Sequence, residues 1–148
     1  MATRRQQLGE RGEVYVARRR TCPRCKRHGT LKRLPTNFKC ADIICDFCGY
    51  LAQVKTLTVK DVGVVPEMII GAAWGPQKDR MAAGIFFPLF LVLVADDKMA
   101  IYYLSADLQD PHMFKKRKPL SPTARRAGWQ GFRYDLKKLM DGAIVRLD

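Results

Sequence analysis

Serine and histidine are both scarce in this sequence of 148 residues. Its serines are Ser105 and Ser121, and neither lies in the context of a nucleophile elbow. Its histidines, His28 and His112, lie in polar stretches where a solvent-exposed position is more frequent than a catalytic one. The segment from Gly71 to Gly75 lacks the Lys-Ser or Lys-Thr pair of a phosphate-binding loop. These absences argue against serine-type hydrolases and against P-loop nucleotide hydrolases.

Long hydrophobic runs are also missing. The longest apolar run, from Ile85 to Ala95, has eleven residues, contains Pro88 and is too short to span a bilayer. We therefore expect it to be a buried strand. No apolar signal segment precedes the Arg-rich N-terminus, so we expect a cytoplasmic protein without a membrane partner.

Acidic residues are few relative to basic ones. The chain has 27 Lys and Arg against 14 Asp and Glu, a formal net charge of +13, and a pI of about 9.9. Such an excess favours a polyanionic partner, and we expect double-stranded DNA, bound through its phosphates. The hydrophobic fraction of 47% is ordinary for a globular protein, and the length predicts one domain over residues 1–148.

Four of the five cysteines form two Cys-x2-Cys pairs. Cys22 and Cys25 are separated by nineteen residues from Cys45 and Cys48, a spacing typical of a four-thiolate zinc ribbon. Such a site is closed and has no open position for catalysis, so the zinc would be structural. The alternative, two disulfides, requires an oxidising compartment. Cys40 lies outside the pattern, and we expect a small, buried, reduced thiol there.

A second motif overlaps the second cysteine pair. Asp42 precedes this pair and Gln53-Val54-Lys55 follows it. The order Asp, then Glu or Gln, any residue and Lys is the one with which metal-dependent nucleases hold a divalent cation beside a phosphate. Strands are expected at Cys40–Ile44 and Leu51–Val59. A hairpin of these two strands would carry Asp42 and Lys55 close together.

The rest of the chain shows no internal repeat and no low-complexity tract, which indicates a compact organisation. Turn residues and hydrophobic periodicity divide it into further elements. We expect a helix over Gln6–Ala17, a loop over Asp61–Gly71, a helix over Pro76–Ala83, strands over Ile85–Val94 and Met99–Leu104, and an edge strand over Ala143–Leu147.

The C-terminal third carries the strongest resemblance to a known family. The block Lys118–Trp129, followed by Tyr134-Asp135-Leu136, closely resembles a segment of the catalytic domain of DpnI-like restriction endonucleases. The Cys-Pro-x-Cys pair, the Ala-Asp dipeptide at Asp42 and the ten-residue gap before the Gln-x-Lys tripeptide occur upstream in the same order. Together these features cover most of the chain from Glu13 to Leu147.

The resemblance implies an α/β fold of the PD-(D/E)XK nuclease type, a mixed sheet flanked by helices. A zinc ribbon, at about residues 20–50, would be inserted between the first helix and the active-site hairpin. The implied activity is Mg²⁺-dependent cleavage of DNA, including adenine-methylated DNA. Asp42, Gln53 and the backbone carbonyl of Val54 would bind Mg²⁺, and Lys55 would position or activate the attacking water. Glu13 is either a further carboxylate for this site or a solvated charge on the helix.

Gln53 departs from the family pattern, which has Glu at this position. An amide oxygen can coordinate a cation, but as a dipole it holds the cation less strongly than a carboxylate. Other branches of the nuclease superfamily use Gln before the x-Lys, so the chain is either an active endonuclease or a non-catalytic, zinc-stabilised module that binds nucleic acid. Members of the family carry a second, winged-helix domain that also recognises methyladenine, and the chain stops at Asp148 without one. We therefore expect either that a separate protein recognises the methylated base or that the specificity for methylated DNA is looser.

Several basic segments are candidates for DNA contacts. The run Lys115–Lys118 is either a solvated charge run or part of the interface, and Trp129 either stacks on a base or fills the core. Arg125 and Arg126 beside this tryptophan offer bidentate donors to phosphate or guanine. The residues expected at a DNA interface are Arg18, Arg19, Arg20, Arg24, Lys115, Lys116, Arg117, Lys118, Arg125, Arg126 and Trp129.

Overall fold

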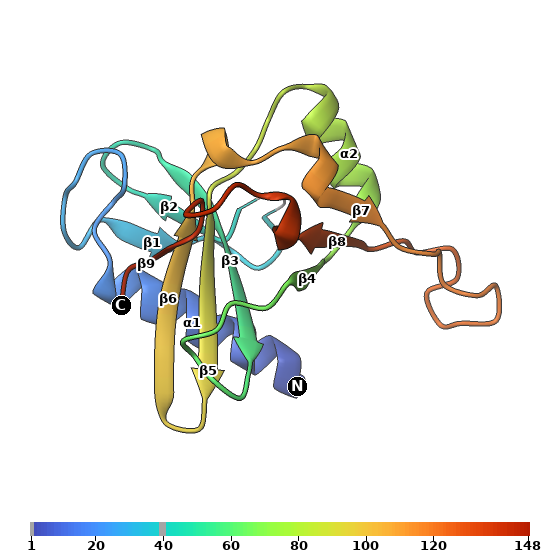
Figure 1. Cartoon of the computed structure of the whole chain (residues 1–148), viewed down its shortest axis with the longest axis horizontal. Helices are drawn as coiled ribbons and strands as arrows, with labels where there is room; N and C mark the ends of the chain where they lie inside the picture. The colour runs from blue at the N-terminus through green and yellow to red at the C-terminus, as the bar shows by residue number, and fades with distance from the viewer. Residues whose placement is uncertain (1, 39–40) are drawn as a thin grey trace. The chain divides into compact units, whose positions relative to one another are not determined.

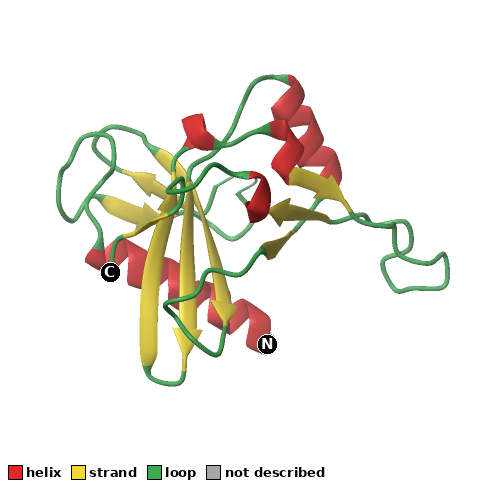
Figure 2. Cartoon of the chain, viewed as in Figure 1, coloured by secondary structure: helices red, strands yellow, loops and turns green. Residues whose placement is uncertain are grey.

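The computed structural model describes residues 2–38 and 41–148. The chain divides into two compact units, drawn with their helices and strands in Figure 2. The first unit holds the residues up to Val64 together with Phe87–Ala106 and Ile144–Asp148, and the second holds Val65–Phe86 and Asp107–Ala143. The expected single domain over residues 1–148 stays a prediction.

The first unit is built on a six-stranded sheet with the order β1-β2-β3-β5-β6-β9. Strands β3 and β5 pair in parallel, and the other neighbours pair antiparallel, so the expected mixed sheet is confirmed. The short strand β9 lies at the edge, as its sequence predicts. The bounds are β1 (Leu31–Arg33), β2 (Ile43–Cys45), β3 (Leu51–Thr58), β5 (Leu89–Ala95), β6 (Lys98–Leu104) and β9 (Val145–Arg146).

Helix α1 (Arg4–Arg19) packs against β3, as Figure 1 shows. A capping box between Thr3 and Gln6 satisfies backbone donors at its start. The helix approaches the sheet closely at Gly12, where an added Cβ would lie 1.8 Å from the Thr56 hydroxyl oxygen. Only glycine fits this contact. Among the described residues, no helix has the length and apolar character needed to cross a bilayer.

The core of this unit lies around β5, whose seven residues are all buried. This strand begins at Leu89, four residues later than the apolar run predicts. Pro88 has no N–H group to donate to a neighbouring strand, but its carbonyl accepts from the Gln53 N–H at 2.8 Å. The residues Ile85 to Phe87 therefore lead into the strand without belonging to it.

The second unit contains a three-stranded antiparallel sheet with the order β4-β8-β7. Its aromatic core brings Phe114, Phe132 and Tyr134 within 5.1 to 6.0 Å of one another, measured between ring centroids. The expected loop over Asp61–Gly71 is wrong in its last part, where β4 pairs with β8. The elements are β4 (Met68–Gly71), α2 (Trp74–Ala82), β7 (Phe114–Lys116) and β8 (Phe132–Asp135).

Candidate metal centres and nucleic-acid interface

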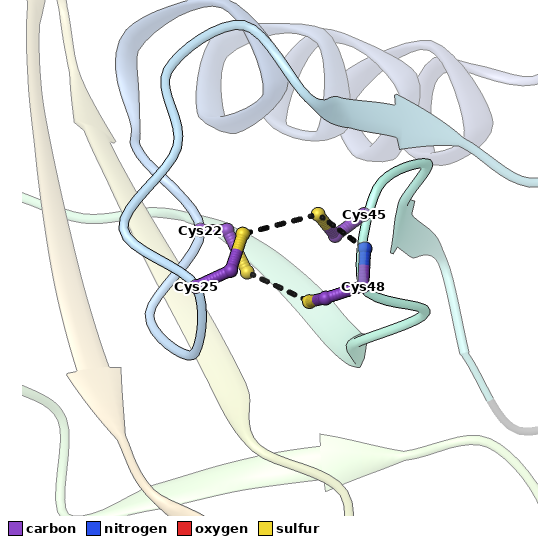
Figure 3. Close-up of side chains that lie close together, drawn as sticks. All are labelled: Cys22, Cys25, Cys45 and Cys48. Atoms are coloured by element: carbon purple, nitrogen blue, oxygen red, sulfur yellow. Dashed lines mark hydrogen bonds between the residues drawn. The ribbon is translucent and has the colours of Figure 1, made fainter.

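The four paired cysteines meet in the first unit (Figure 3). Their sulfur atoms all lie within 4.8 Å of one another. The Sγ atoms of Cys22 and Cys48 are 3.6 Å apart, and those of Cys25 and Cys45 are 3.7 Å apart. Zinc with sulfur at about 2.3 Å in a tetrahedron requires sulfurs about 3.8 Å apart. The cluster therefore has the donor atoms and the size of a structural four-thiolate zinc site.

Each cysteine pair closes a tight turn that directs both sulfurs inward. The Lys26 N–H donates to the Cys22 carbonyl at 2.9 Å, and the Gly49 N–H donates to the Cys45 carbonyl at 2.9 Å. Lys26 and Gly49 both have positive φ angles, 64° and 80°, which the turns require. Each Cys-x2-Cys pair thus forms one turn that supplies two of the four sulfur atoms.

The surroundings of the Cys45 thiol lower its pKa. Burial opposes its ionisation, but hydrogen bonds with the Thr30 hydroxyl and with the backbone N–H groups of Cys48 and Phe47 lower the pKa of Cys45 to about 6. The distance from Cys45 Sγ to Thr30 Oγ1 is 3.2 Å. Because the thiolate is the form that binds zinc, these contacts fit a metal ligand. Cys40, expected to be a free thiol, lies outside the described residues.

Asp42 lies directly before β2, where pairing with β3 holds it in place. Its N–H donates to the Ala52 carbonyl at 2.9 Å. Its carboxylate oxygen Oδ2 accepts from the Val54 N–H at 2.7 Å. In an extended strand the N–H and C=O groups of one residue point to the same edge, so the Val54 carbonyl faces this edge as well. The side chain of Asp42 is thereby fixed beside the β3 backbone.

Burial shapes the ionisation of both charged residues in the motif. It raises the pKa of Asp42 above its ordinary value, although the Val54 hydrogen bond and the Lys55 charge lower it in part. Burial also lowers the pKa of Lys55, and the Asp42 charge offsets part of this effect. The charges of Asp42 and Lys55 are therefore close enough for each to shift the pKa of the other.

Gln53 and Lys55 lie on one face of β3, because alternate residues of a strand share a face. Ala52 and Val54, on the other face, are buried in the core. This alternation places Gln53 and Lys55 on the face of the sheet opposite Ala52 and Val54. The Gln53 and Lys55 side chains are both partly buried.

Glu13 joins this group from helix α1. Burial raises the pKa of Glu13, and the charge of Asp42 raises it further, whereas Arg33 lowers it in part. Glu13 is therefore a partly buried carboxylate near Asp42, with a side chain 19% exposed, and its part in a metal site stays a prediction. Arg33 in β1 forms ion pairs with Glu13 and with Glu10. Sequence reasoning missed Arg33, because only the β1 pairing places it beside the helix.

The four arginines expected to contact DNA from the first unit differ in their surroundings. Arg19 forms an ion pair with Asp148 at 3.0 Å, and Arg20 donates to the Leu147 carbonyl at 3.5 Å. Arg24 is exposed and lies over the Tyr50 ring at 5.3 Å, and Arg18 is exposed at the end of α1. Two of the four thus already contact the residues that follow β9.

The basic residues of the second unit surround the loop between β7 and β8, which projects from the ends of these strands in Figure 1. The loop is closed by backbone hydrogen bonds, from Leu120 N–H to the Trp129 carbonyl at 2.8 Å and from Gly128 N–H to the Leu120 carbonyl at 3.1 Å. The Arg126 guanidinium lies 4.7 Å from the centre of the Trp129 ring. Lys115 pairs with Asp135 at 3.6 Å. The exposed basic residues here are Lys115, Lys116, Arg117, Lys118, Arg125 and Arg126.

The model of the family described as DpnI, the Dam-replacing family, matches residues 3–147. The matched range contains the cysteine cluster, Asp42, the Gln-Val-Lys tripeptide and the basic loop. It covers nearly the whole chain.

The cysteine cluster generates a prediction about metal content. Protein purified without chelator should contain one zinc per chain, and Cys48→Ser should lose it together with folding free energy on the order of 10 kcal/mol. Elemental analysis and urea unfolding measure the two effects. The matched control is Cys40→Ser, which removes the cysteine outside the pattern and should keep full zinc content. A zinc-free wild-type protein would contradict the assignment.

The raised pKa of Asp42 predicts an unusual effect on stability. Its folded pKa lies above the unfolded value, so ionised Asp42 destabilises the fold, and this one contribution is relieved as the pH falls through the folded pKa of Asp42. Asp42→Asn removes the charge and keeps an oxygen for the Val54 N–H. We expect this variant to be more stable than the wild type at pH 7 without divalent cations, with a smaller difference at pH 4.5.

Urea unfolding at both pH values, in zinc-containing buffer free of Mg²⁺, measures this difference. Asp141→Asn serves as the control, because it removes an exposed carboxylate from the second unit. Lower stability of Asp42→Asn at pH 7 would show that the ionised carboxylate stabilises the fold instead.

Proposed function

Because the chain belongs to the DpnI, or Dam-replacing, family, we propose that it is a zinc-containing, Mg²⁺-dependent endonuclease that hydrolyses phosphodiester bonds in double-stranded DNA. The observation that supports the proposal is the Asp42 carboxylate, held beside β3 by the Val54 N–H at 2.7 Å and close enough to Lys55 for each charge to shift the pKa of the other. The resemblance to DpnI-like enzymes extends the proposal to adenine-methylated DNA and to a restriction system.

The oxygen atoms of the proposed site are of the kind that binds Mg²⁺. The Asp42 carboxylate, the Gln53 side-chain oxygen and the Val54 carbonyl are hard oxygen ligands, which Mg²⁺ prefers while keeping several of its waters. Glu13 offers a second carboxylate from α1. When bound, the cation stabilises the charge that develops on the scissile phosphate. The protein contributes the fixed positions of these oxygens.

Lys55 has two functions in the proposed mechanism. Its lowered pKa increases the share of neutral amine, which can take a proton from the attacking water. In its protonated form it offsets charge on the phosphate. The Asp42 charge favours this protonated form of Lys55. Hydrolysis then requires a water held in line with the leaving oxygen.

The basic loop between β7 and β8 is the proposed DNA-binding segment of the second unit. Arg125 and Arg126 are exposed, and the stacked Arg126–Trp129 pair combines a phosphate donor with an aromatic plane. Trp129 is only partly buried, so part of its ring is accessible. Arg18 and Arg24 are the exposed candidates of the first unit for phosphate contacts.

One observation favours a second function, a non-catalytic nucleic-acid-binding module stabilised by zinc. Gln53 supplies a dipole where the family pattern has a carboxylate, so fewer negative charges hold the cation. Both functions predict DNA binding. They differ in whether the bound DNA is cut.

Cleavage of plasmid DNA tests the proposed active site. We expect the wild type to cut only with Mg²⁺ or Mn²⁺, and Asp42→Ala or Lys55→Ala to lower the rate by at least about 100-fold while binding persists. Gln53→Glu should retain or raise activity at low Mg²⁺, because a second carboxylate strengthens the electrostatic hold on the cation.

The assay compares methylated and unmethylated plasmid, next to an electrophoretic shift with and without Mg²⁺. If the wild type cuts neither plasmid with either cation but Gln53→Glu does, the natural protein is a nuclease-derived binding module. If Lys55→Ala cuts as fast as the wild type, the proposed role of Lys55 is wrong.

The basic loop generates a prediction about binding. Replacing both Arg125 and Arg126 by Ala should weaken the affinity for duplex DNA. In a plot of the logarithm of the binding constant against the logarithm of the salt concentration, the slope should become less steep by about 2. Fluorescence anisotropy over a series of salt concentrations measures both quantities. The control replaces Arg4 and Arg5, at the exposed start of α1, and removes the same charge. Equal effects of the two pairs would show that the loop has no special part in binding.

A further inference from the structure

Arg33 connects the zinc ribbon to the helix that carries Glu13. Its Nε lies 3.4 Å from Glu13 Oε1, and its Nη1 lies 3.4 Å from Glu10 Oε1. Glu10 and Glu13 are neighbours on one face of α1, because residues three apart in a helix lie side by side. One guanidinium thus bridges two carboxylates of the helix.

The strand pairing places this arginine next to the candidate metal site. Arg33 in β1 lies opposite Ile43 in β2, and the following residue, Leu34, donates its N–H to the Asp42 carbonyl at 2.9 Å. The Asp42 carboxylate is near enough to Glu13 to act on it electrostatically. Arg33 is therefore a positive charge paired with Glu13, and the residue after it is held by backbone hydrogen bonding to Asp42.

Resting on the metal site of the proposed function, we propose that Arg33 is a resident counter-cation that holds Glu13 until a divalent cation displaces it. Arg33 is then a positioning residue. It neutralises Glu13 while no cation is bound, and it lowers the affinity for the cation by competing for this carboxylate.

The geometry of the ion pairs suits an exchange of partners. Both contacts, at 3.4 Å, are longer than the roughly 2.7 to 2.9 Å of strong charge-assisted hydrogen bonds, so little is lost when one breaks. The Glu10 side chain is 58% exposed, whereas that of Glu13 is 19% exposed. When Glu13 turns to a cation, Arg33 keeps Glu10 as its partner and is not left unpaired.

Calorimetric titration of the zinc-loaded protein with Mn²⁺, without DNA, tests this proposal. Arg33→Gln removes the charge and retains a side chain that can donate hydrogen bonds. We expect it to bind Mn²⁺ more tightly than the wild type, on the order of tenfold at low ionic strength, with a smaller gain at high salt. The matched control is Lys32→Gln, which removes one charge from the opposite face of β1 and should change the affinity little.

A double-mutant cycle with Glu13→Gln separates competition from a general charge effect. Glu13→Gln should weaken Mn²⁺ binding, and in that background Arg33→Gln should add little. Weaker binding by Arg33→Gln, or a change equal to that of Lys32→Gln, would overturn the proposal. Zinc content and the urea midpoint of each variant show whether the fold is retained.

Asp42→Asn distinguishes this proposal from the proposed function. If Asp42→Asn abolishes Mn²⁺ binding but Arg33→Gln does not tighten it, the metal site stands and only the role of Arg33 is wrong. If the wild type binds no Mn²⁺ at this site, the proposed metal site is wrong and the role of Arg33 falls with it.

Discussion

The pairing of β2 with β3 is the interaction on which both candidate centres depend. Strand β2 has three residues and ends at Cys45, a ligand of the proposed zinc site, while Asp42 lies directly before it. Pairing with β3 fixes this short strand from one side, and pairing with β1 fixes it from the other. Loss of metal from the cysteine cluster would release one end of β2 and so loosen the position of the Asp42 carboxylate.

The parts of the fold that sequence reasoning found are those with strong local signals. The cysteine spacing is the one that lets four thiolates bind a single zinc ion. The β-branched residues around the Gln-Val-Lys tripeptide are typical of a strand with one face in the core. Both predictions rest on patterns that can be recognised within a short stretch of sequence. The apolar run that became β5 was also found, although Pro88 moved its start.

The parts that were missed depend on contacts between distant segments. Strand β4 has only four residues and exposes Met68 and Ile70, so its alternation is too short to stand out from a loop. It exists because β8, more than sixty residues later, supplies its partner. Arg33 was missed for the same reason, since nothing in its neighbourhood in the sequence distinguishes it from the other arginines. The identity of its partners follows only from the packing of β1 beside α1.

The backbone hydrogen bonds that close the β7–β8 loop have a consequence for the kinetics of association. A loop that is disordered before binding must lose conformational entropy when it meets its partner. Here Leu120, Gly128 and Trp129 already bond to one another, and the Arg117 N–H donates to the Gly131 carbonyl at 3.0 Å. Arg125 and Arg126 thus lie on a loop that is already closed by backbone hydrogen bonds, so the proposed binding of DNA would require little ordering of the loop, and electrostatic attraction would then have the larger influence on its rate.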